Sequence, residues 1–309
     1  RQNSLNDTLL SDSNIYTSTG GVINLIATGN INIGSNINPN AYISVNGVNG
    51  GVINIVSTNG AVNHYGVIDA VGKLGSGGQI IVAGAISTNV IGGMVAADGL
   101  SQGGLIGVGI INTNGSGSIL APPATAPPVM VNFINNAANS LSGFISANTE
   151  LNAGTTMSVN AGKSNSNTQA GQVYIAGNLS LNTSASINAN ADNGGLILSS
   201  SPAGTYQNSG YIQTNGGSGL GGTVAQSGLI STILSGGTIE AMGSLGGGNI
   251  VIGRDFHSSP LAGSASQAAS LPSLANVVTL PTSKLTIIAS GVALNSSAIA
   301  LGNGGNILV

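Results

Sequence analysis

Aliphatic residues alternate with polar or small residues in many short stretches of the chain, and glycine and asparagine separate these stretches. In GGVINI, residues 50–55, Ile53 and Ile55 share one face of an extended strand, while Val52 and Asn54 share the other. Alternation with period two is typical of a β-strand with one buried face. Glycine at this density disfavours helices, because each one costs about 1 kcal/mol relative to alanine inside a helix. The pattern predicts an all-β protein.

The stretches belong to a repeat. GVIDAVGKLGSGGQIIVAG at residues 66–84 and GTIEAMGSLGGGNIVIG at 237–253 are nearly the same phrase, and shorter copies lie between them. The first aliphatic positions, numbered 43, 68 and 95 and again 187, 212 and 239, are separated by 25, 27, 25 and 27 residues. A copy near residue 119 would divide the 50 residues between 95 and 145 into two further units. Each unit has room for three short strands, for example GVINIVS, VNHY and GVIDAV.

A repeat of this length favours a coil of a parallel β-helix over a blade of a β-propeller. Blades of a propeller have repeats of about 40 to 50 residues, which is too long. A right-handed parallel β-helix fits, with each strand pairing with its counterpart one repeat further on and with Gly and Asn at the corners. We expect roughly eleven three-strand coils of about 25–27 residues, stacked at about 4.8 Å into a rod of roughly 50 Å.

The inward positions of this coil predict a column of aliphatic core residues along the axis. We expect the following residues to form it: Ile23, Ile43, Ile53, Ile68, Ile80, Val95, Ile106, Ile145, Ile187, Ile212, Ile239, Ile250, Ile299 and Ile307.

Three segments depart from the repeat. Residues 1–20 are polar and are expected to form an N-terminal tail or cap, whereas residues 21–309 form one continuous solenoid. Four prolines in APPATAPPVMVNF indicate a loop insertion near residues 121–128, because proline cannot donate a hydrogen bond to a strand ladder. A second insertion, rich in small residues, is expected near residues 254–275. Insertions on solenoids often form a binding face, but a loop without function is an equal alternative.

The composition narrows the classes of function. Charged residues make up 4% of the chain and the net charge is −3, so neither a nucleic acid nor an anionic lipid surface is an expected partner. There is no cysteine for disulfides or thiolate ligands, and 41% of the residues are hydrophobic, which is enough to build a core. No apolar run approaches the length of a membrane span, and the first residues lack the pattern of a signal peptide. We therefore expect no membrane insertion.

Catalytic and metal sites require polar side chains that meet on neighbouring coils. Asp69 and Glu240 occupy equivalent positions but are predicted to lie six or seven coils apart, at about 30 Å, which is too far for acid–base cooperation. His64 and His257 are about 190 residues apart without nearby carboxylates, which argues against a metal triad. Asp192 is read as a turn residue. We expect no enzyme activity, no catalytic residue, no metal and no cofactor.

The pairing of G-x-I-x-A-x-G with GG-x-I-x-I-G, followed by RDF at Arg254 to Phe256, resembles the filamentous haemagglutinin family over most of residues 20–309. An NPN triplet at Asn38 to Asn40 is similar to a motif of that family's secretion domain, although the residues that follow it differ from the usual continuation. The resemblance implies a parallel β-helix that is exported by two-partner secretion and works as an adhesin or surface fibre.

The chain ends in GGNILV, where Ile307 and Val309 are read as core-facing residues at an open end. This predicts contact with a second copy, head to tail, or with further repeats of a longer chain. The sequence therefore favours an extracellular or cell-surface β-solenoid that builds a fibre and that can also meet host or matrix glycans. A carbohydrate-binding or polysaccharide-degrading β-helix is the alternative.

Overall fold

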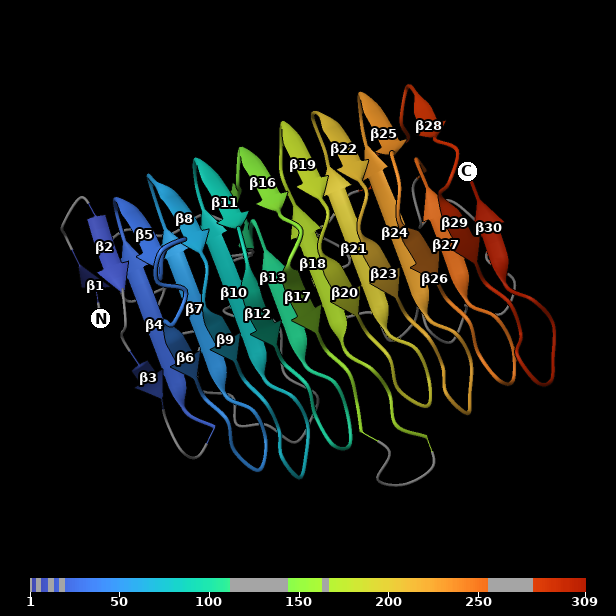
Figure 1. The fold of residues 1–309 in the computed structure, drawn as a ribbon, viewed down its shortest axis with the longest axis horizontal. Helices are drawn as coiled ribbons and strands as arrows, with labels where there is room; N and C mark the ends of the chain where they lie inside the picture. The colour runs from blue at the N-terminus through green and yellow to red at the C-terminus, as the bar shows by residue number, and fades with distance from the viewer. Residues whose placement is uncertain are drawn as a thin grey trace.

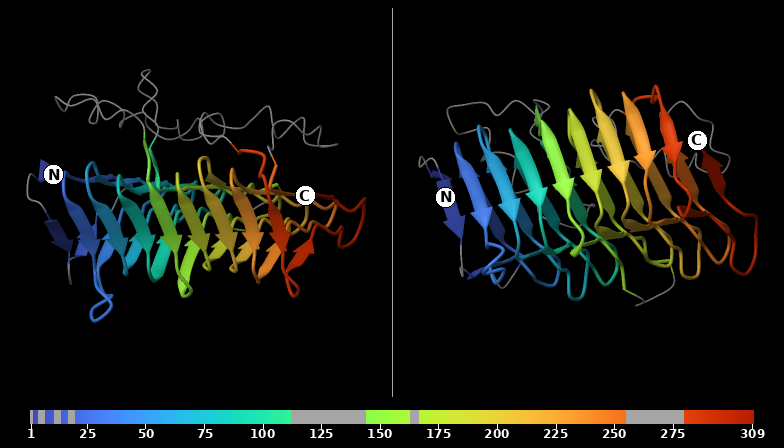
Figure 2. Two further views of the ribbon diagram at one scale, coloured as in Figure 1. Left: turned by 90° about the horizontal axis from the view of Figure 1, so that it is seen from above. Right: turned by 45° about the horizontal axis from the view of Figure 1, so that its top comes forward.

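Three long parallel sheets form the faces of a β-solenoid in the computed structural model, which describes residues 2–3, 7–10, 14–16, 20–111, 144–162, 167–254 and 280–309. One turn of the chain passes through all three sheets before the next turn stacks on it, and we call such a turn a rung (Figure 1). The two chain ends lie at opposite ends of the stack (Figure 2). The predicted all-β parallel β-helix is confirmed.

The first sheet, sheet A, is the longest. It orders its ten strands as β1 (Gln2–Asn3), β4 (Val22–Ala27), β7 (Val52–Ser57), β10 (Gln79–Gly84), β13 (Leu105–Val108), β18 (Gln172–Ala176), β21 (Leu196–Ser201), β24 (Thr223–Gly228), β27 (Asn249–Ile252) and β30 (Asn306–Leu308).

Sheets B and C complete each rung with nine strands apiece. Sheet B contains β2 (Asp7–Leu10), β5 (Asn30–Ile33), β8 (Ala61–His64), β11 (Ser87–Val90), β16 (Asn148–Leu151), β19 (Ser180–Thr183), β22 (Thr205–Asn208), β25 (Ser231–Leu234) and β28 (Thr286–Ile288). Sheet C contains β3 (Asn14–Tyr16), β6 (Tyr42–Ser44), β9 (Val67–Asp69), β12 (Gly93–Ala96), β17 (Thr155–Ser158), β20 (Ser186–Asn188), β23 (Tyr211–Gln213), β26 (Thr238–Glu240) and β29 (Ala293–Asn295).

A short antiparallel pair, β14 (Ile110–Ile111) with β15 (Phe144–Ile145), stands outside the three sheets. The rungs on either side of it stack directly, because β11 pairs with β16 and β12 with β17. No turn is inserted between these rungs, so the solenoid has fewer turns than the eleven expected. The expected copy near residue 119 and the loop near 121–128 lie outside the described residues, as does most of the loop near 254–275.

The solenoid also starts earlier than predicted. Residues 1–20, expected to be a tail or cap, contribute β1, β2 and β3, which pair in parallel with β4, β5 and β6. The repeated alternation of the later rungs is weak in this polar stretch, which is why the sequence pattern did not extend to it.

Aliphatic side chains fill the interior in columns, one residue from each rung. In sheet A the column contains Ile23, Ile53, Ile80, Ile106, Ile250 and Ile307 in register, and in sheet C it contains Ile43, Ile68, Val95, Ile187, Ile212 and Ile239. Except for Ile307 on the last rung, all of these side chains are buried. Burial of each contributes about 1.5–3 kcal/mol to folding.

Two predicted core residues lie elsewhere. Ile145 pairs with Ile110 and packs on the outer side of sheet A, while Met157 fills the sheet C column on that rung. Ile299 is 62% exposed because Leu294, five residues earlier, pairs with Ile239. Both errors arise where the chain between successive rungs is longer than the regular repeat, so that the spacing no longer identifies the inward residue.

Asparagines hold the corner that follows sheet C. The side-chain Oδ1 of Asn160 accepts a hydrogen bond from the backbone N–H of Asn190 at 2.8 Å, and Asn190 does the same for Asn215 at 2.7 Å. Asn215 in turn accepts from the N–H of Met242 at 2.9 Å. Each amide therefore satisfies a backbone donor of the next rung, which keeps the corners in register along the axis.

One interior column of sheet A contains polar side chains, Ser199 and Gln226, on two successive rungs. Gln226 occupies a core column between Ser199 and Ile252, and both polar atoms of its amide are buried without a hydrogen-bond partner among the described residues. The Nδ2 of Asn208 is in the same state, although its Oδ1 accepts from Thr183 at 2.7 Å. Burial without a partner costs about 1–3 kcal/mol for such a group.

Replacing Gln226 by isoleucine should therefore raise the free energy of unfolding by about 1–3 kcal/mol. Isoleucine would extend the aliphatic column that resumes at Ile252 and would remove both unpartnered atoms. Urea unfolding followed by far-ultraviolet circular dichroism measures the change. Gln207→Ile on the exposed side of β22 is the control and should change stability little. A destabilised Gln226→Ile variant would show that the amide is satisfied in the folded protein.

Sheet A also has an apolar outer face. Tyr174, Leu198, Ala225 and Val251 point away from the interior on four successive rungs and nevertheless are fully buried. Ile110 and Leu280 belong to the same cluster of buried side chains. The burial of Tyr174 raises the pKa of its phenol well above the usual range. This face of the solenoid is thus a second, smaller apolar core.

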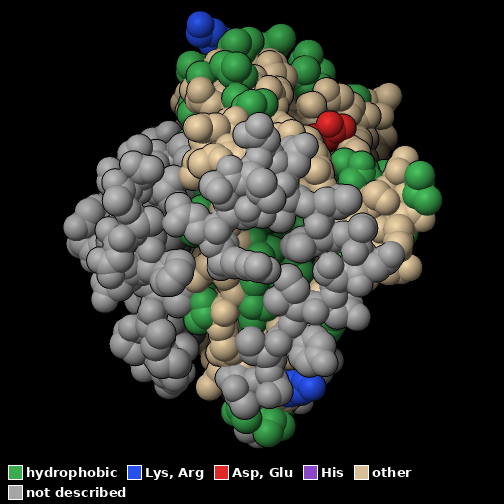
Figure 3. All heavy atoms as spheres, turned by 90° about the vertical axis from the view of Figure 1, so that its left-hand side faces the viewer, with side chains coloured by type: hydrophobic (Ala, Val, Ile, Leu, Met, Phe, Trp, Pro, Cys, Tyr) green, Lys and Arg blue, Asp and Glu red, His purple; other side chains and the backbone are tan. Residues whose placement is uncertain are grey.

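The described residues include no helix long and apolar enough to span a membrane. Charged side chains are sparse on the surface shown in Figure 3. In the end-on view of Figure 3, the few acidic and basic groups of the described residues stand apart from one another among hydrophobic and uncharged polar atoms.

Candidate functional site

A groove runs along the solenoid axis where sheet B turns into sheet C. It has a volume of about 360 Å³ and crosses the rungs that contain β17, β20, β23 and β26. Successive rungs stack at about 4.8 Å, so the groove extends for about 14 Å. Its lining residues are Gly154, Thr155, Thr156, Ser184, Ala185, Ser186, Ser209, Gly210, Tyr211, Gly237 and Thr238.

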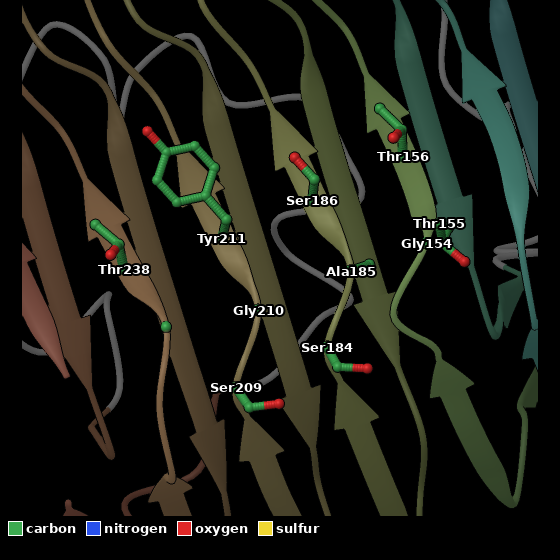
Figure 4. A pocket seen from close by; sticks show the side chains of 11 residues that line it. Gly154, Thr155, Thr156, Ser184, Ala185, Ser186, Ser209, Gly210, Tyr211 and Thr238 are labelled. Carbon is green, nitrogen blue, oxygen red and sulfur yellow. The ribbon is translucent and has the colours of Figure 1, made fainter. Parts of the chain in front are cut away.

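The groove exists because its floor consists of small residues. Gly237 has a φ of +82°, which favours glycine, and a Cβ there would overlap the carbonyl oxygen of Gly210. On one side of the floor, Ser184 and Ser209 follow the ends of β19 and β22. On the other side, Thr156, Ser186, Tyr211 and Thr238 form one outward row of sheet C (Figure 4). The long walls therefore present hydroxyl groups at the spacing of the rungs.

Tyr211 is the only aromatic residue among those that line the groove, and the residue is 38% exposed. Its hydroxyl donates to Oε2 of Glu240 on the next rung at 3.1 Å. The same oxygen accepts from Nε2 of Gln213 at 2.6 Å and from Nδ2 of Asn215 at 3.0 Å. These contacts fix the direction of the ring, so little conformational entropy remains to be lost when a ligand stacks on it.

The surroundings of Glu240 and Tyr211 determine the charge of each at neutral pH. Burial opposes the charge on Glu240, but hydrogen bonds from Asn215, Gln213 and Tyr211 outweigh it and lower the pKa of the carboxyl. Burial and the neighbouring Glu240 carboxylate raise the pKa of Tyr211. Glu240 is therefore an anion that accepts hydrogen bonds, and Tyr211 is a neutral phenol that donates one.

The same arrangement occurs once more, near the other end of the row. The hydroxyl of Tyr42 donates to Oδ2 of Asp69 at 2.8 Å, and Nδ2 of Asn46 donates to that oxygen at 3.0 Å. In each case the tyrosine and the asparagine are four residues apart, and the acid lies on the next rung. We call each set a tyrosine clasp. Tyr42 differs in its surroundings. Its row continues with Val67 and then Met94, whereas Ser186 and Thr238 flank Tyr211.

The two acids of the clasps are far apart. The column between them runs through Ala96, Ser158, Asn188 and Gln213, which places Asp69 and Glu240 five rungs apart, or about 24 Å. The prediction of six or seven coils was too large because Ala96 pairs directly with Ser158, without a further rung between them. The conclusion that the two acids do not meet holds, and the positions next to Glu240 are occupied by Gln213 and Asn295.

Two further acidic residues, Asp98 and Asp192, serve the local structure. Asp98 accepts from the hydroxyl of Ser158 at 2.8 Å and from the N–H of Asn160 at 2.6 Å, and its burial raises the pKa. Asp192 accepts from the N–H and the hydroxyl of Thr168 and from the hydroxyl of Ser218, which lowers its pKa. Within the described residues, no three potential ligands among His, Cys, Asp and Glu are grouped to hold a metal ion. His257 lies outside the described residues.

His64 is a core residue rather than a surface one. It occupies a sheet B column between Ile33 and Val90, and neither ring nitrogen has a hydrogen-bond partner among the described residues. Burial lowers the pKa of its imidazole to about 4. A single histidine next to Asn63 gives no sign in the sequence that its ring points into the core.

The residues predicted for end-to-end contact lie on the last rung. Ile307 continues the sheet A column above Ile250 and is 43% exposed, and Val309 is exposed beside it. Ile288 and Leu294 end the sheet B and sheet C columns on the same rung. The column ends thus form an apolar surface at this end of the stack.

Searches against protein-family models, curated proteins and solved structures found no match to this chain.

Proposed function

We propose that this chain is a structural and adhesive segment of an extracellular or cell-surface fibre. The main support is the C-terminal rung, where the aliphatic columns of all three sheets reach the surface in register. Ile307 and Ile288 remain 43% and 39% exposed there, although their counterparts on the preceding rung, Ile250 and Leu234, are buried. A further rung would bury these side chains at about 25 cal/mol for each Å² of apolar surface.

The partner that fits this surface is another rung of the same kind. Strands β28, β29 and β30 are the last of their sheets, and β1, β2 and β3 stand at the opposite ends. A strand at the edge of a sheet can pair with an added strand through its backbone. A second copy stacked head to tail, or further repeats of a longer chain, would supply three such strands at once. The low net charge of −3 offers little repulsion between copies.

We also propose that the chain is exported and that it belongs to the filamentous haemagglutinin family. The repeat resembles that of filamentous haemagglutinins, and a parallel β-solenoid is the fold that this resemblance implies. The proposed role is not enzymatic. It accords with a groove in which Glu240 is flanked along its column by Gln213 and Asn295 rather than by a second acid.

Sedimentation velocity and electron microscopy of the full chain at increasing concentration test the assembly. We expect rods whose length grows with concentration. Ile307→Lys should abolish this growth, because it places a charge in the column end that the next rung must bury. Ile299→Lys is the matched control, since Ile299 is even more exposed but lies outside the columns. Short rods of one length in all three proteins would refute head-to-tail assembly.

A further inference from the structure

We propose that the groove between sheets B and C binds a neutral linear oligosaccharide or polysaccharide, which lies along the solenoid axis with a sugar ring stacked on Tyr211. This inference deepens the adhesive part of the proposed function and does not depend on end-to-end assembly.

The chemistry of the lining selects the ligand class. The groove residues include five hydroxyl-bearing side chains besides the buried Thr155 and the ring of Tyr211, and none of them is Lys, Arg, Asp or Glu. A phosphate or sulfate group would need basic partners, and an apolar ligand would need apolar walls. Hydroxyl groups both donate and accept hydrogen bonds, so they complement a ligand that is itself covered with hydroxyl groups.

Tyr211 supplies the apolar contact that such a ligand requires. A sugar ring presents C–H groups on its faces, and these can pack on the electron-rich face of an aromatic ring while the hydroxyl groups at the rim remain hydrogen-bonded. The exposed ring of Tyr211 projects beside Ser186 and Thr238, and its hydroxyl is already held by Glu240 (Figure 4). The ring is therefore a fixed platform with hydrogen-bonding groups on both sides.

The spacing of the lining favours a chain over a single sugar. Equivalent residues recur once in each rung, at intervals of about 4.8 Å, along a groove of about 14 Å. Thr156, Ser186 and Thr238 stand in one row with Tyr211, and Ser184 and Ser209 stand in a second row. A polymer of similar units can make the same contacts repeatedly, whereas a monosaccharide would use only one part of the groove.

The two tyrosine clasps allow the platform to be separated from its structural role. Tyr42 makes the same hydrogen bonds with Asp69 as Tyr211 does with Glu240, but it adjoins Val67 rather than serine or threonine on the following rung. Tyr42→Ala should therefore cost the fold as much as Tyr211→Ala and leave ligand binding intact. Tyr211→Phe keeps the ring and loses only the hydroxyl, with its hydrogen bonds to Glu240 and Gln213.

The experiment uses the full chain on an array of neutral linear oligosaccharides, with β-1,4-linked glucose and N-acetylglucosamine chains, their monosaccharides, and sulfated counterparts. Isothermal titration calorimetry then measures affinity for the chains retained. We expect neutral chains to bind more tightly than monosaccharides or sulfated chains. Tyr211→Ala should weaken binding at least tenfold, Tyr211→Phe by no more than a few-fold, and Tyr42→Ala not measurably.

A second variant keeps the test independent of the clasp. Ser186→Arg places a long side chain in the middle of the groove from a partly exposed strand position and should also abolish binding. The inference would be overturned if none of the neutral chains bound. It would also be overturned if Tyr211→Ala bound as tightly as the parent protein, or if Tyr42→Ala lost as much affinity as Tyr211→Ala. Rods that still lengthen with concentration while binding fails would leave the assembly proposal standing and remove this one alone.

Discussion

Gly222→Ala should lower the free energy of unfolding by about 3 kcal/mol or more, or prevent folding altogether. Gly222 lies at the corner before β24, where the backbone passes close to that of the preceding rung. A Cβ at this position would overlap the carbonyl oxygen of Gly195 and crowd the backbone of Gly194. Backbone atoms of a hydrogen-bonded rung cannot move aside without breaking the pairing of β21 with β24.

Gly92→Ala is the matched control for this effect. A Cβ at Gly92 would meet no atom within 4 Å, and its backbone does not have a positive φ. The substitution should leave stability unchanged or raise it slightly, because alanine reduces the freedom of the unfolded chain. Urea unfolding of the two variants beside the parent protein measures the difference. Equal effects of the two substitutions would show that close approach between rungs does not explain why glycine recurs at the corners.

Protonation of His64 in the unfolded chain should lower the free energy of unfolding by about 3 kcal/mol as the pH falls from about 6.5 to about 4, because this residue is buried in its neutral form. The pKa of its imidazole is about 4 in the folded protein, against 6.5 for the exposed residue. Between these values the unfolded chain takes up a proton that the folded protein does not. The stabilising effect of the neutral ring is therefore complete above pH 6.5 and is lost on acidification.

His64→Leu should remove this pH dependence and raise stability at neutral pH. Leucine would complete the aliphatic column between Ile33 and Val90 and would eliminate two ring nitrogens that lack partners. Urea unfolding of the parent and the variant at pH 7.5, 6, 5 and 4.5 gives the comparison. Subtracting the two curves isolates His64 from the carboxyl groups and from His257. Parallel curves would mean that His64 is accessible to protons in the folded protein.

The sequence was sufficient to predict the repeating rung and most of its core, because inward aliphatic residues recur at a nearly constant interval. It misplaced Ile145 and Ile299, where the interval changes and the spacing no longer identifies the inward residue. Spacing alone could not distinguish Leu294 from Ile299 as the core residue of the last rung. The decision depends on the length of the preceding corner, which is a property of the backbone.

The groove and the tyrosine clasps were not predicted. Tyr42 with Asn46 and Tyr211 with Asn215 have the same four-residue spacing, and in each case an acid follows the tyrosine by 27 or 29 residues. That common spacing was a usable signal once the repeat length was known. No pattern in the sequence indicated the groove itself, since it arises where small floor residues coincide with hydroxyl-bearing neighbours on adjacent rungs.

The arrangement of the strands across the long axis determines how the molecule would respond to tension. Its termini lie at opposite ends of the stack, so a pull between them acts along the direction of the backbone hydrogen bonds (Figure 1). These bonds would open one turn at a time from an end rather than all together by shear. Each freed turn of about 25 residues could lengthen from about 4.8 Å to about 80 Å. A tether built from such turns would yield in long steps under load and absorb mechanical work before its attachment is torn away.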